Sequence, residues 1–196
     1  MDGWVEKSSA DMVRGDGMKE PYGIVVFGPN GSGKTTLGRE LARVLGFKHM
    51  DIEDYYFGKS EIPYTVARPR EEWLRLMLAD IEKHGVFVMT GCTCDYGDVI
   101  PQYYRLGVHI SAPHELRMER VKQRAYDMYG VRVLEGGDMY EQEQKFFDYV
   151  AKRPLARIDE WAATLKCQVI QIDGTKDWRE NAAEIVKMWD CGSSPQ

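Results

Sequence analysis

The sequence has no stretch of about 18 or more consecutive apolar residues, the length at which a transmembrane helix is expected. Its first seven residues, Met1 to Lys7, also lack the apolar core that a signal peptide carries. These two absences predict a cytoplasmic protein that makes no contact with a membrane.

Cysteine is scarce, with four residues in a chain of 196. One Cys-x-Cys pair occurs, but no second pair and no histidine stand at zinc-finger spacing, so we expect reduced thiols and no structural zinc. Cys92 and Cys94 follow a predicted strand at the edge of the site described below. For these two residues, ordinary packing and a functional thiol are both open interpretations.

Positive charge is in slight deficit, with 26 Lys and Arg residues against 31 Asp and Glu residues. This balance argues against a broad basic surface for nucleic acid or anionic lipid, so any anion site must be a local pocket. The length suits one domain, and the 43% hydrophobic content is enough to fill a core. We expect a monomer or homodimer with no bulk nucleic-acid binding.

Residues 28–35 read GPNGSGKT and match the phosphate-binding template G-x-x-x-x-G-K-[ST] at every fixed position. The loop follows a β-branched and aromatic run and precedes an amphipathic helical stretch, as the template requires. The glycines allow a tight turn and let backbone N–H groups converge on phosphate oxygens. The predicted nucleotide site comprises Gly28, Pro29, Asn30, Gly31, Ser32, Gly33, Lys34, Thr35 and Thr36.

Two side chains of this loop carry specific expectations. Lys34 places a positive charge on the β and γ phosphates, and the hydroxyl of Thr35 ligates Mg²⁺. The helix that begins here adds unpaired N–H groups and the positive end of its dipole. The sequence therefore predicts ATP and Mg²⁺ as ligands.

Strand-like and helical segments alternate along the rest of the chain, which predicts a parallel sheet covered on both faces by helices. Ligands then gather at the carboxyl ends of the strands. The residues before Tyr22 show no periodicity and are expected to form a loose leader. Strands are predicted over 24–27, 47–51, 86–90, 106–110 and 168–172, and helices after Lys34, from Arg70 to Gly85, over 113–128, over 139–165 with a break at Pro154, and after Asp177.

An acidic segment, Asp51-Ile52-Glu53-Asp54, follows the second predicted strand. Carboxylates at this edge of the sheet can hold Mg²⁺ through water or accept a proton from an acceptor hydroxyl. The alternative interpretation is a helix cap and turn, in which Asp is also common.

Arg117, Arg120 and Arg124 lie on one stripe of the fourth predicted helix. Only Asp127 lies within reach as a partner, and like charges at this spacing cost about a few tenths of a kcal/mol per pair unless an anion binds between them. We interpret the stripe as triphosphate-binding, with a solvated charged face as the alternative. The opposite stripe is apolar and is expected to pack on the sheet; it comprises Met118, Val121, Ala125 and Met128.

A glycine-punctuated segment, residues 130–138, separates two arginine-bearing helical regions. It is typical of a mobile lid that expels water during phosphoryl transfer, although a plain surface loop fits as well. Arg153 and Arg157 lie one turn apart beyond it and are placed to close onto the phosphates.

The order of these features resembles the small P-loop kinases of the nucleoside monophosphate kinase and shikimate kinase group, over residues 22 to about 190. The resemblance implies a three-layer α/β/α P-loop NTPase fold with a central five-stranded parallel sheet. It also implies one domain over 22–192 with a lid at about 129–153 and a short tail at 193–196. Arg120 and Arg124 match the start of the lid in nucleoside monophosphate kinases.

The resemblance also implies site residues. Met50-Asp51-Ile52-Glu53 is similar to the F-x-D-x-D segment of shikimate kinases, which implies Asp51 near Mg²⁺ and Glu53 toward the acceptor. The segment 67–71, ARPRE, is similar to their F-R-x-x-E, which makes Arg68 the first and Arg70 the second acceptor-site candidate. The triplet 54–56, DYY, is closer to the D-D-[FY]-[FY] of uridine kinases, so Asp54 is a rival catalytic acid.

Other segments depart from the family patterns. Shikimate kinases have a triple glycine after the third strand, and adenylate kinases have D-G-[FY]-P-R there, whereas this chain has Thr90-Gly91-Cys92-Thr93. Gly91 is retained as an acceptor-site candidate, but neither acceptor is predicted. The R-x-P-L-Y segment of shikimate kinases aligns imperfectly with residues 152–156, KRPLA, which moves Arg153 next to the proline.

The sequence thus predicts an ATP-dependent, Mg²⁺-dependent phosphotransferase acting on a small metabolite or nucleotide. Lys34, Arg120, Arg124 and Arg153 stabilise the transferred group, while Asp51, Glu53 and Asp54 supply the acidic functions. Two alternatives are a regulatory or switch NTPase and a nucleotide-binding protein that lacks catalysis. Against the first, the chain has no N-K-x-D or L-S-G-G-Q signature.

Overall fold

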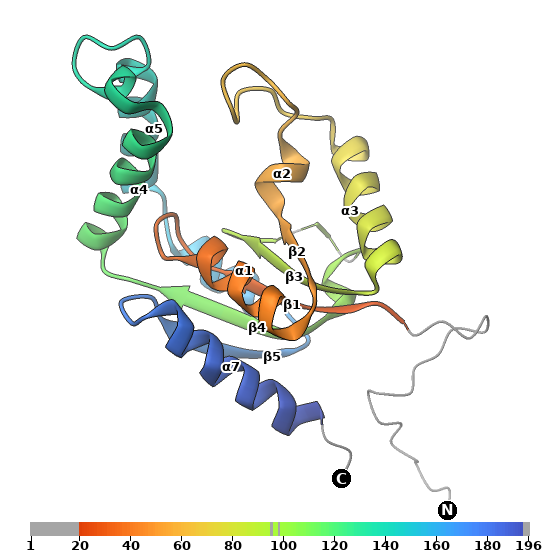
Figure 1. Ribbon diagram of the computed structural model, residues 1–196. Helices are drawn as coiled ribbons and strands as arrows, with labels where there is room; N and C mark the ends of the chain where they lie inside the picture. The colour runs from red at the N-terminus through yellow and green to blue at the C-terminus, as the bar shows by residue number, and fades with distance from the viewer. Residues whose placement is uncertain (1–19, 95, 98, 194–196) are drawn as a thin grey trace, which may run out of the picture.

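The computed structural model describes residues 20–193 except residues 95 and 98. Its centre is a five-stranded sheet in the order β2-β3-β1-β4-β5, and every neighbouring pair is parallel (Figure 1). The five predicted strands are confirmed, with ends that differ by up to two residues. The strands are β1 (Tyr22–Phe27), β2 (Lys48–Asp51), β3 (Val86–Gly91), β4 (Tyr104–Ser111) and β5 (Gln168–Asp173).

Helices cover both faces of the sheet, so the central strand β1 is buried on both sides. Ile24 and Val26 pack with α1 (Lys34–Leu45) and α7 (Trp178–Ser193) in one apolar cluster. Val25 and Phe27 face the opposite way and pack with α3 (Arg70–His84) and α6 (Ala156–Ala162) in another. The period-two alternation of a strand thus separates the two cores, and the predicted three-layer α/β/α architecture is confirmed.

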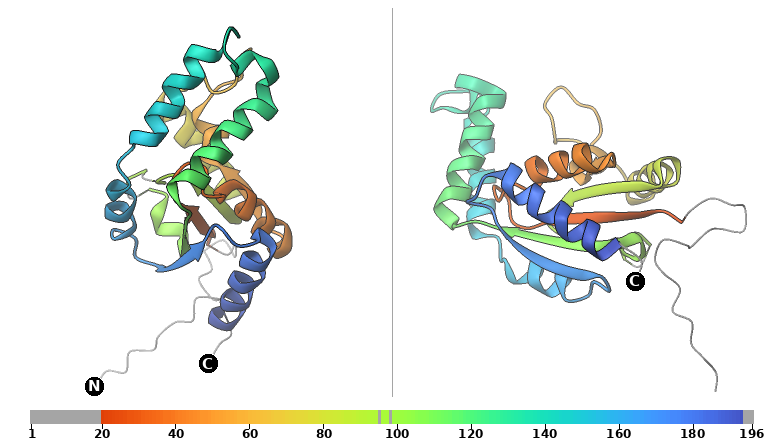
Figure 2. Two further views of the ribbon diagram at one scale, coloured as in Figure 1. Left: turned by 90° about the vertical axis from the view of Figure 1, so that its left-hand side faces the viewer. Right: turned by 60° about the horizontal axis from the view of Figure 1, so that its bottom comes forward.

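Two helices stand beyond the sheet as a pair, α4 (His114–Tyr129) and α5 (Tyr140–Lys152), joined through the 3₁₀ helix η2 (Gly130–Val133) (Figures 1 and 2). They have a third apolar cluster of their own, in which Val121 and Ala125 pack with Phe147 and Val150.

The expectation that the apolar stripe of α4 packs on the sheet is therefore wrong. Val121 and Ala125 are buried against α5, Met118 packs beside them, and Met128 is 45% exposed. The physical reason is that the other helices already cover both faces of the sheet, so the stripe is buried against the next amphipathic helix along the chain.

Local sequence signals fix most helix ends. Gly46 and Gly85 follow α1 and α3 with φ of 70° and 71°, and in each case the glycine N–H bonds back into the helix. Asp177 accepts a 2.7 Å hydrogen bond from the N–H of Arg179 at the start of α7. Pro154 separates α5 from α6, as predicted.

The sequence missed one helix, α2 (Ile52–Tyr56), which lies within the acidic segment. Five residues are too few to show a helical period. The predicted leader before Tyr22 and the tail at 193–196 lie almost entirely outside the described residues. In the part of the chain that the structure describes, no helix is both long and apolar enough to span a membrane.

Candidate active site

The phosphate loop connects β1 to α1 at the carboxyl edge of the sheet. Gly28 and Gly31 have φ of 149° and 77°, and a Cβ on either would lie 2.1 Å from Ile110 O or 2.3 Å from Arg117 O. Both positions therefore require glycine, because the loop is pressed against the backbones of β4 and α4. The first turn of α1 contains no acidic residue and its cap forms no side-chain hydrogen bond, so its N–H groups are available to an anion.

Polar groups of the loop are arranged around this turn. Lys34 Nζ donates a 2.8 Å hydrogen bond to the carbonyl of Pro29, so the lysine lies back across the loop. The hydroxyl of Ser32 is buried and lacks a partner among the described residues. Gly33 occupies the cap position of α1, and the side chain of Thr36 is on its exposed face. An unpartnered buried hydroxyl and free helix N–H groups fit a bound phosphate.

Thr35 and Asp51 form a pair at the start of α1. The Thr35 hydroxyl donates to Asp51 Oδ2 over 3.0 Å, while Asp51 Oδ1 accepts from the N–H of Glu53 over 3.2 Å. Asp51 thus ends β2 and caps α2, so the capping interpretation of the acidic segment is correct for this residue.

A hydroxyl and a carboxylate oxygen side by side fit Mg²⁺, which is typically held by one or two protein oxygens together with phosphates and water. Among the described residues, no cluster of three His, Cys, Asp or Glu side chains can hold a metal ion. Magnesium at Thr35 and Asp51 would consequently depend on the nucleotide for its remaining ligands.

The three arginines of α4 have different environments. Arg117 is 4% exposed and donates to the carbonyls of Ala112 (3.1 Å) and Asn30 (3.4 Å). Arg120 donates to the carbonyls of Gly174 (2.9 Å) and Gly31 (3.4 Å).

Backbone carbonyls therefore accept the hydrogen bonds of Arg117 and Arg120. These two guanidinium groups join α4 to the phosphate loop. Arg124 forms no hydrogen bond or ion pair with any described residue, and it lines the pocket described below. The three side chains that share one stripe thus have two different roles in the structure.

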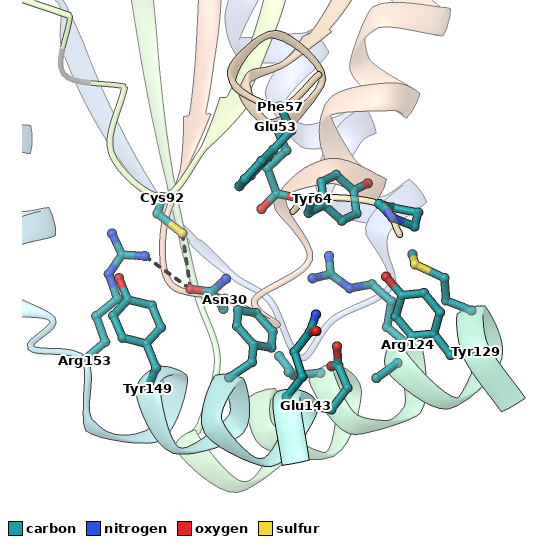
Figure 3. Close-up of a pocket in the computed structure, with 16 residues that line it drawn as sticks. Asn30, Glu53, Phe57, Tyr64, Cys92, Arg124, Tyr129, Glu143, Tyr149 and Arg153 are labelled. Carbon is teal, nitrogen blue, oxygen red and sulfur yellow. Dashed lines mark hydrogen bonds between the residues drawn. The ribbon is translucent and has the colours of Figure 1, made fainter. Parts of the chain in front are cut away.

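Asn30 connects three segments that are far apart in sequence. Its Oδ1 lies 3.4 Å from Cys92 Sγ, just after β3, and 3.4 Å from Nη1 of Arg153, just after α5 (Figure 3). Cys92 therefore borders the site, whereas Cys94 is fully buried. Burial raises the pKa of the Cys94 thiol, which makes it an inert packing residue.

A pocket of about 400 Å³ opens between the phosphate loop, α2 and the α4–α5 pair (Figure 3). The charged side chains among its described lining residues are two acids and two arginines, Glu53, Glu143, Arg124 and Arg153. Five aromatic rings from separate parts of the chain complete much of the wall: Phe57, Tyr64, Tyr129, Phe146 and Tyr149.

The pocket distinguishes the two acids of α2. Glu53 lines it, and desolvation by burial, followed by the charge of Asp51, raises the pKa of Glu53, while Arg124 and Lys34 oppose the shift. Asp54 is exposed and does not line the pocket.

Unlike Glu53, the other predicted acceptor-site residues do not line this pocket. Arg68 donates to the carbonyls of Asp54 (3.0 Å), Tyr55 (2.5 Å) and Phe57, so its guanidinium holds the C-terminal end of α2. Arg70 is exposed at the first residue of α3.

Gly91 and Arg157 also lie outside the lining of the pocket. Gly91 is buried at the end of β3, where a Cβ would lie 2.8 Å from Cys94 Sγ. Arg157 is exposed on α6 and does not join Arg153 at the phosphate loop.

The sequence missed the aromatic wall and Glu143. The signal was a run of aromatic residues at 146, 147 and 149 in the lid region, of which Phe147 is buried in the α4–α5 core. Phe146 and Tyr149 line the pocket instead. Helical periodicity alone does not show which of these aromatic residues is buried in the core and which line a pocket.

Comparison with known proteins supports this description. The chain matches the AAA domain family, AAA_18, over residues 24–146. It is 30% identical over 158 residues to the Uncharacterized protein YqaC of Bacillus subtilis (strain 168), covering 76% of this chain and 87% of that protein. A 67-residue segment is 37% identical to the Vesicle-fusing ATPase of Caenorhabditis elegans, covering 30% of this chain and 8% of that protein.

Among solved structures, the shikimate kinase from Acinetobacter baumannii in complex with shikimate superimposes with a TM-score of 0.54 at 18% identity. The match covers 89% of this chain and 96% of that one, and at this identity it shows the fold. The chain therefore belongs to the AAA domain family, and its fold is that of the small P-loop kinases of the nucleoside monophosphate kinase and shikimate kinase group.

Proposed function

We propose that this protein is a magnesium-dependent kinase that transfers the γ-phosphoryl group of ATP to a hydroxyl group of a small molecule. The observation that carries the proposal is the continuity of the phosphate loop with the pocket. Asn30 of the loop lines the same 400 Å³ space as Glu53, Arg124 and Arg153. A donor phosphate on the loop and an acceptor in the pocket would therefore be neighbours.

The donor side uses the phosphate loop. Backbone N–H groups of residues 30–35 and the N-terminus of α1 bind the β and γ phosphates. Lys34, whose ammonium group lies across the loop at the carbonyl of Pro29, binds the β and γ phosphates. Thr35 and Asp51 hold Mg²⁺, which supplies neutralisation of phosphate charge.

On the acceptor side, Glu53 is the stronger candidate for the catalytic base. Its carboxyl faces the pocket, whereas Asp54 is exposed. The acceptor oxygen forms a bond to the γ phosphorus as the bond to the bridging oxygen of ADP breaks, and the hydroxyl proton passes to Glu53.

Two arginines complete this assignment. Arg124 and Arg153 neutralise the charge that spreads over the transferred group, because both guanidinium groups line the pocket and neither forms an ion pair with a described residue. Arg120 acts on the donor side through its bonds to Gly31 and Gly174, which shape the loop.

The test is ADP formation from Mg-ATP with and without a panel of acceptor hydroxyl compounds. A kinase releases ADP only when an acceptor is present and yields a phosphorylated product in equal amount. Lys34→Ala is expected to abolish turnover, whereas Lys187→Ala, at an exposed position of α7, leaves it unchanged. ADP release that is independent of every acceptor would instead indicate a switch NTPase, and no binding of ATP would reject the proposal.

A further inference from the structure

Glu143 of α5 is a buried acid that the donor and catalytic assignments do not use. It is 7% exposed, and its carboxyl forms no hydrogen bond or ion pair with any described residue. The side chain is largely buried, but its carboxyl oxygens are not among the enclosed polar atoms without a partner, so they stay open to the pocket. Since Glu143 lines the pocket, its carboxyl faces the space where the acceptor would bind (Figure 3).

The charges around Glu143 restrict what can fill this space. Burial raises the pKa of Glu143 and of Glu53, and the charge of Arg124 opposes both shifts, so Arg124 acts on both acids. Among the described residues of the lining, Arg153 is the only other charged side chain. With both arginines assigned to the transferred phosphoryl group, the described part of the lining leaves no cation for a phosphate or carboxylate on the acceptor.

The remaining wall favours a flat ring. Phe57 and Tyr64 come from the segment between α2 and α3, whereas Phe146 and Tyr149 come from α5. Tyr64 is 42% and Tyr149 is 57% exposed, so two large aromatic side chains are left open to solvent beside the pocket. Aromatic side chains that line a cavity in this way are suited to stacking on a planar ligand.

We infer that the acceptor is a nucleoside that carries no phosphate of its own. Its base lies between the aromatic walls and donates N–H groups to the carboxyl of Glu143, as an amino-substituted heterocycle does. A sugar hydroxyl then reaches Glu53, loses its proton there and receives the γ-phosphoryl group, and ADP leaves. This inference rests on the proposed kinase activity and adds the substrate class.

The first experiment compares four acceptor classes under identical Mg-ATP conditions: guanosine, adenosine, cytidine and uridine; their 5′-monophosphates; shikimate as a hydroxy acid; and glucose as a sugar. The inference predicts that at least one nucleoside has the highest kcat/KM. A preference for a monophosphate, shikimate or glucose would overturn the inference and leave the kinase proposal intact. Acceptor-independent ADP release, or no release at all, would overturn the kinase proposal itself.

The second experiment tests the pocket directly. Glu143→Gln and Tyr149→Leu are expected to raise the KM for the preferred nucleoside by about tenfold or more. The KM for ATP should stay within about twofold in Glu143→Gln, because Glu143 forms no hydrogen bond or ion pair with a described residue of the phosphate loop. Tyr149 lies under the guanidinium of Arg153, 5.9 Å from its ring centroid, so Tyr149→Leu also reports on the position of Arg153. Tyr126→Leu is the matched control, since Tyr126 is an exposed tyrosine of α4 that does not line the pocket.

Calorimetric titration of the same nucleoside provides a readout that does not depend on turnover. Binding should weaken in parallel with the rise in KM for Glu143→Gln and Tyr149→Leu, and should be unchanged in Tyr126→Leu. Tyr149 is more than half exposed, so Tyr149→Leu should fold. Equal nucleoside binding in wild type and in both pocket variants would contradict the inference.

Discussion

The hydroxyl of Thr35 donates a 3.0 Å hydrogen bond to Oδ2 of Asp51 and thereby joins the start of α1 to the end of β2. They lie 16 positions apart in sequence, but both are at the carboxyl edge of the sheet. The second oxygen of the same carboxylate caps α2, the helix that presents Glu53 to the pocket. One aspartate therefore connects the proposed metal site to the proposed catalytic base.

Asp51→Asn is expected to raise the Mg²⁺ concentration needed for half-maximal activity by about tenfold or more, since metal-site partners typically contribute 10–100-fold. The amide keeps one oxygen acceptor, so the cap of α2 and the melting temperature should change little. Magnesium titration of ADP formation measures the effect. Glu184→Gln, on the exposed face of α7, is the control, and an unchanged Mg²⁺ requirement in Asp51→Asn would remove the metal assignment.

Glu53→Gln and Asp54→Asn form a matched pair on one helix. Glu53→Gln should lower kcat by about 100-fold or more, because a positioned general base contributes 10²–10⁴-fold. Asp54→Asn should leave kcat nearly unchanged, since Asp54 is exposed outside the pocket. Steady-state kinetics at saturating ATP compares the two, and the reverse result would assign the base to Asp54.

The raised pKa of Glu53 predicts a pH dependence of stability with a definite sign. Because the folded pKa lies above the usual 4.5, the stability contribution of Glu53 is fully present below 4.5 and is lost as pH rises through the folded pKa. The amide of Glu53→Gln does not ionise, so this variant does not lose that stability as pH rises. Its melting temperature should exceed that of wild type at pH 8 and converge with it near pH 4.

Each kcal/mol gained by Glu53→Gln raises the melting temperature by about 2–4 °C in a chain of this size. Thermal melts at pH 4, 6 and 8 test the trend. Asp54→Asn, at an exposed position of the same helix, serves as the comparison. A Glu53→Gln curve parallel to wild type would contradict the assigned burial of the carboxyl.

Arg120 and Arg124 should give different phenotypes although they lie one turn apart. Arg120→Ala removes bonds to the carbonyls of Gly31 and Gly174, so it should raise the KM for ATP and lower stability by about 1–3 kcal/mol. Arg124→Ala breaks no such bond. It should leave stability nearly unchanged and lower kcat by about 10²–10³-fold, as loss of a group that stabilises transition-state charge does.

Denaturant unfolding and steady-state kinetics on both arginine variants separate these effects. Gln123→Ala, at an exposed position of the same helix, controls for the loss of a long side chain. Equal losses of stability in Arg120→Ala and Arg124→Ala would show that the two arginines do not differ as their contacts indicate.

The sequence by itself determined the phosphate loop and the alternation of strands and helices. These features depend on neighbouring residues: glycines at fixed spacing, β-branched runs, and glycine or proline at helix ends. The loop from Gly28 to Thr35 and the break at Pro154 are clear from the printed sequence for that reason.

Only the tertiary structure decided which surfaces meet. The apolar stripe of α4 predicts that one face is buried, but hydrophobic burial has no direction, so nothing in the stripe specifies α5 as its partner. The arginines at 117 and 120 likewise reach backbone carbonyls that no sequence pattern marks. The pocket brings together Glu53 and Glu143, which lie 90 positions apart in the chain, and only folding makes such distant residues neighbours.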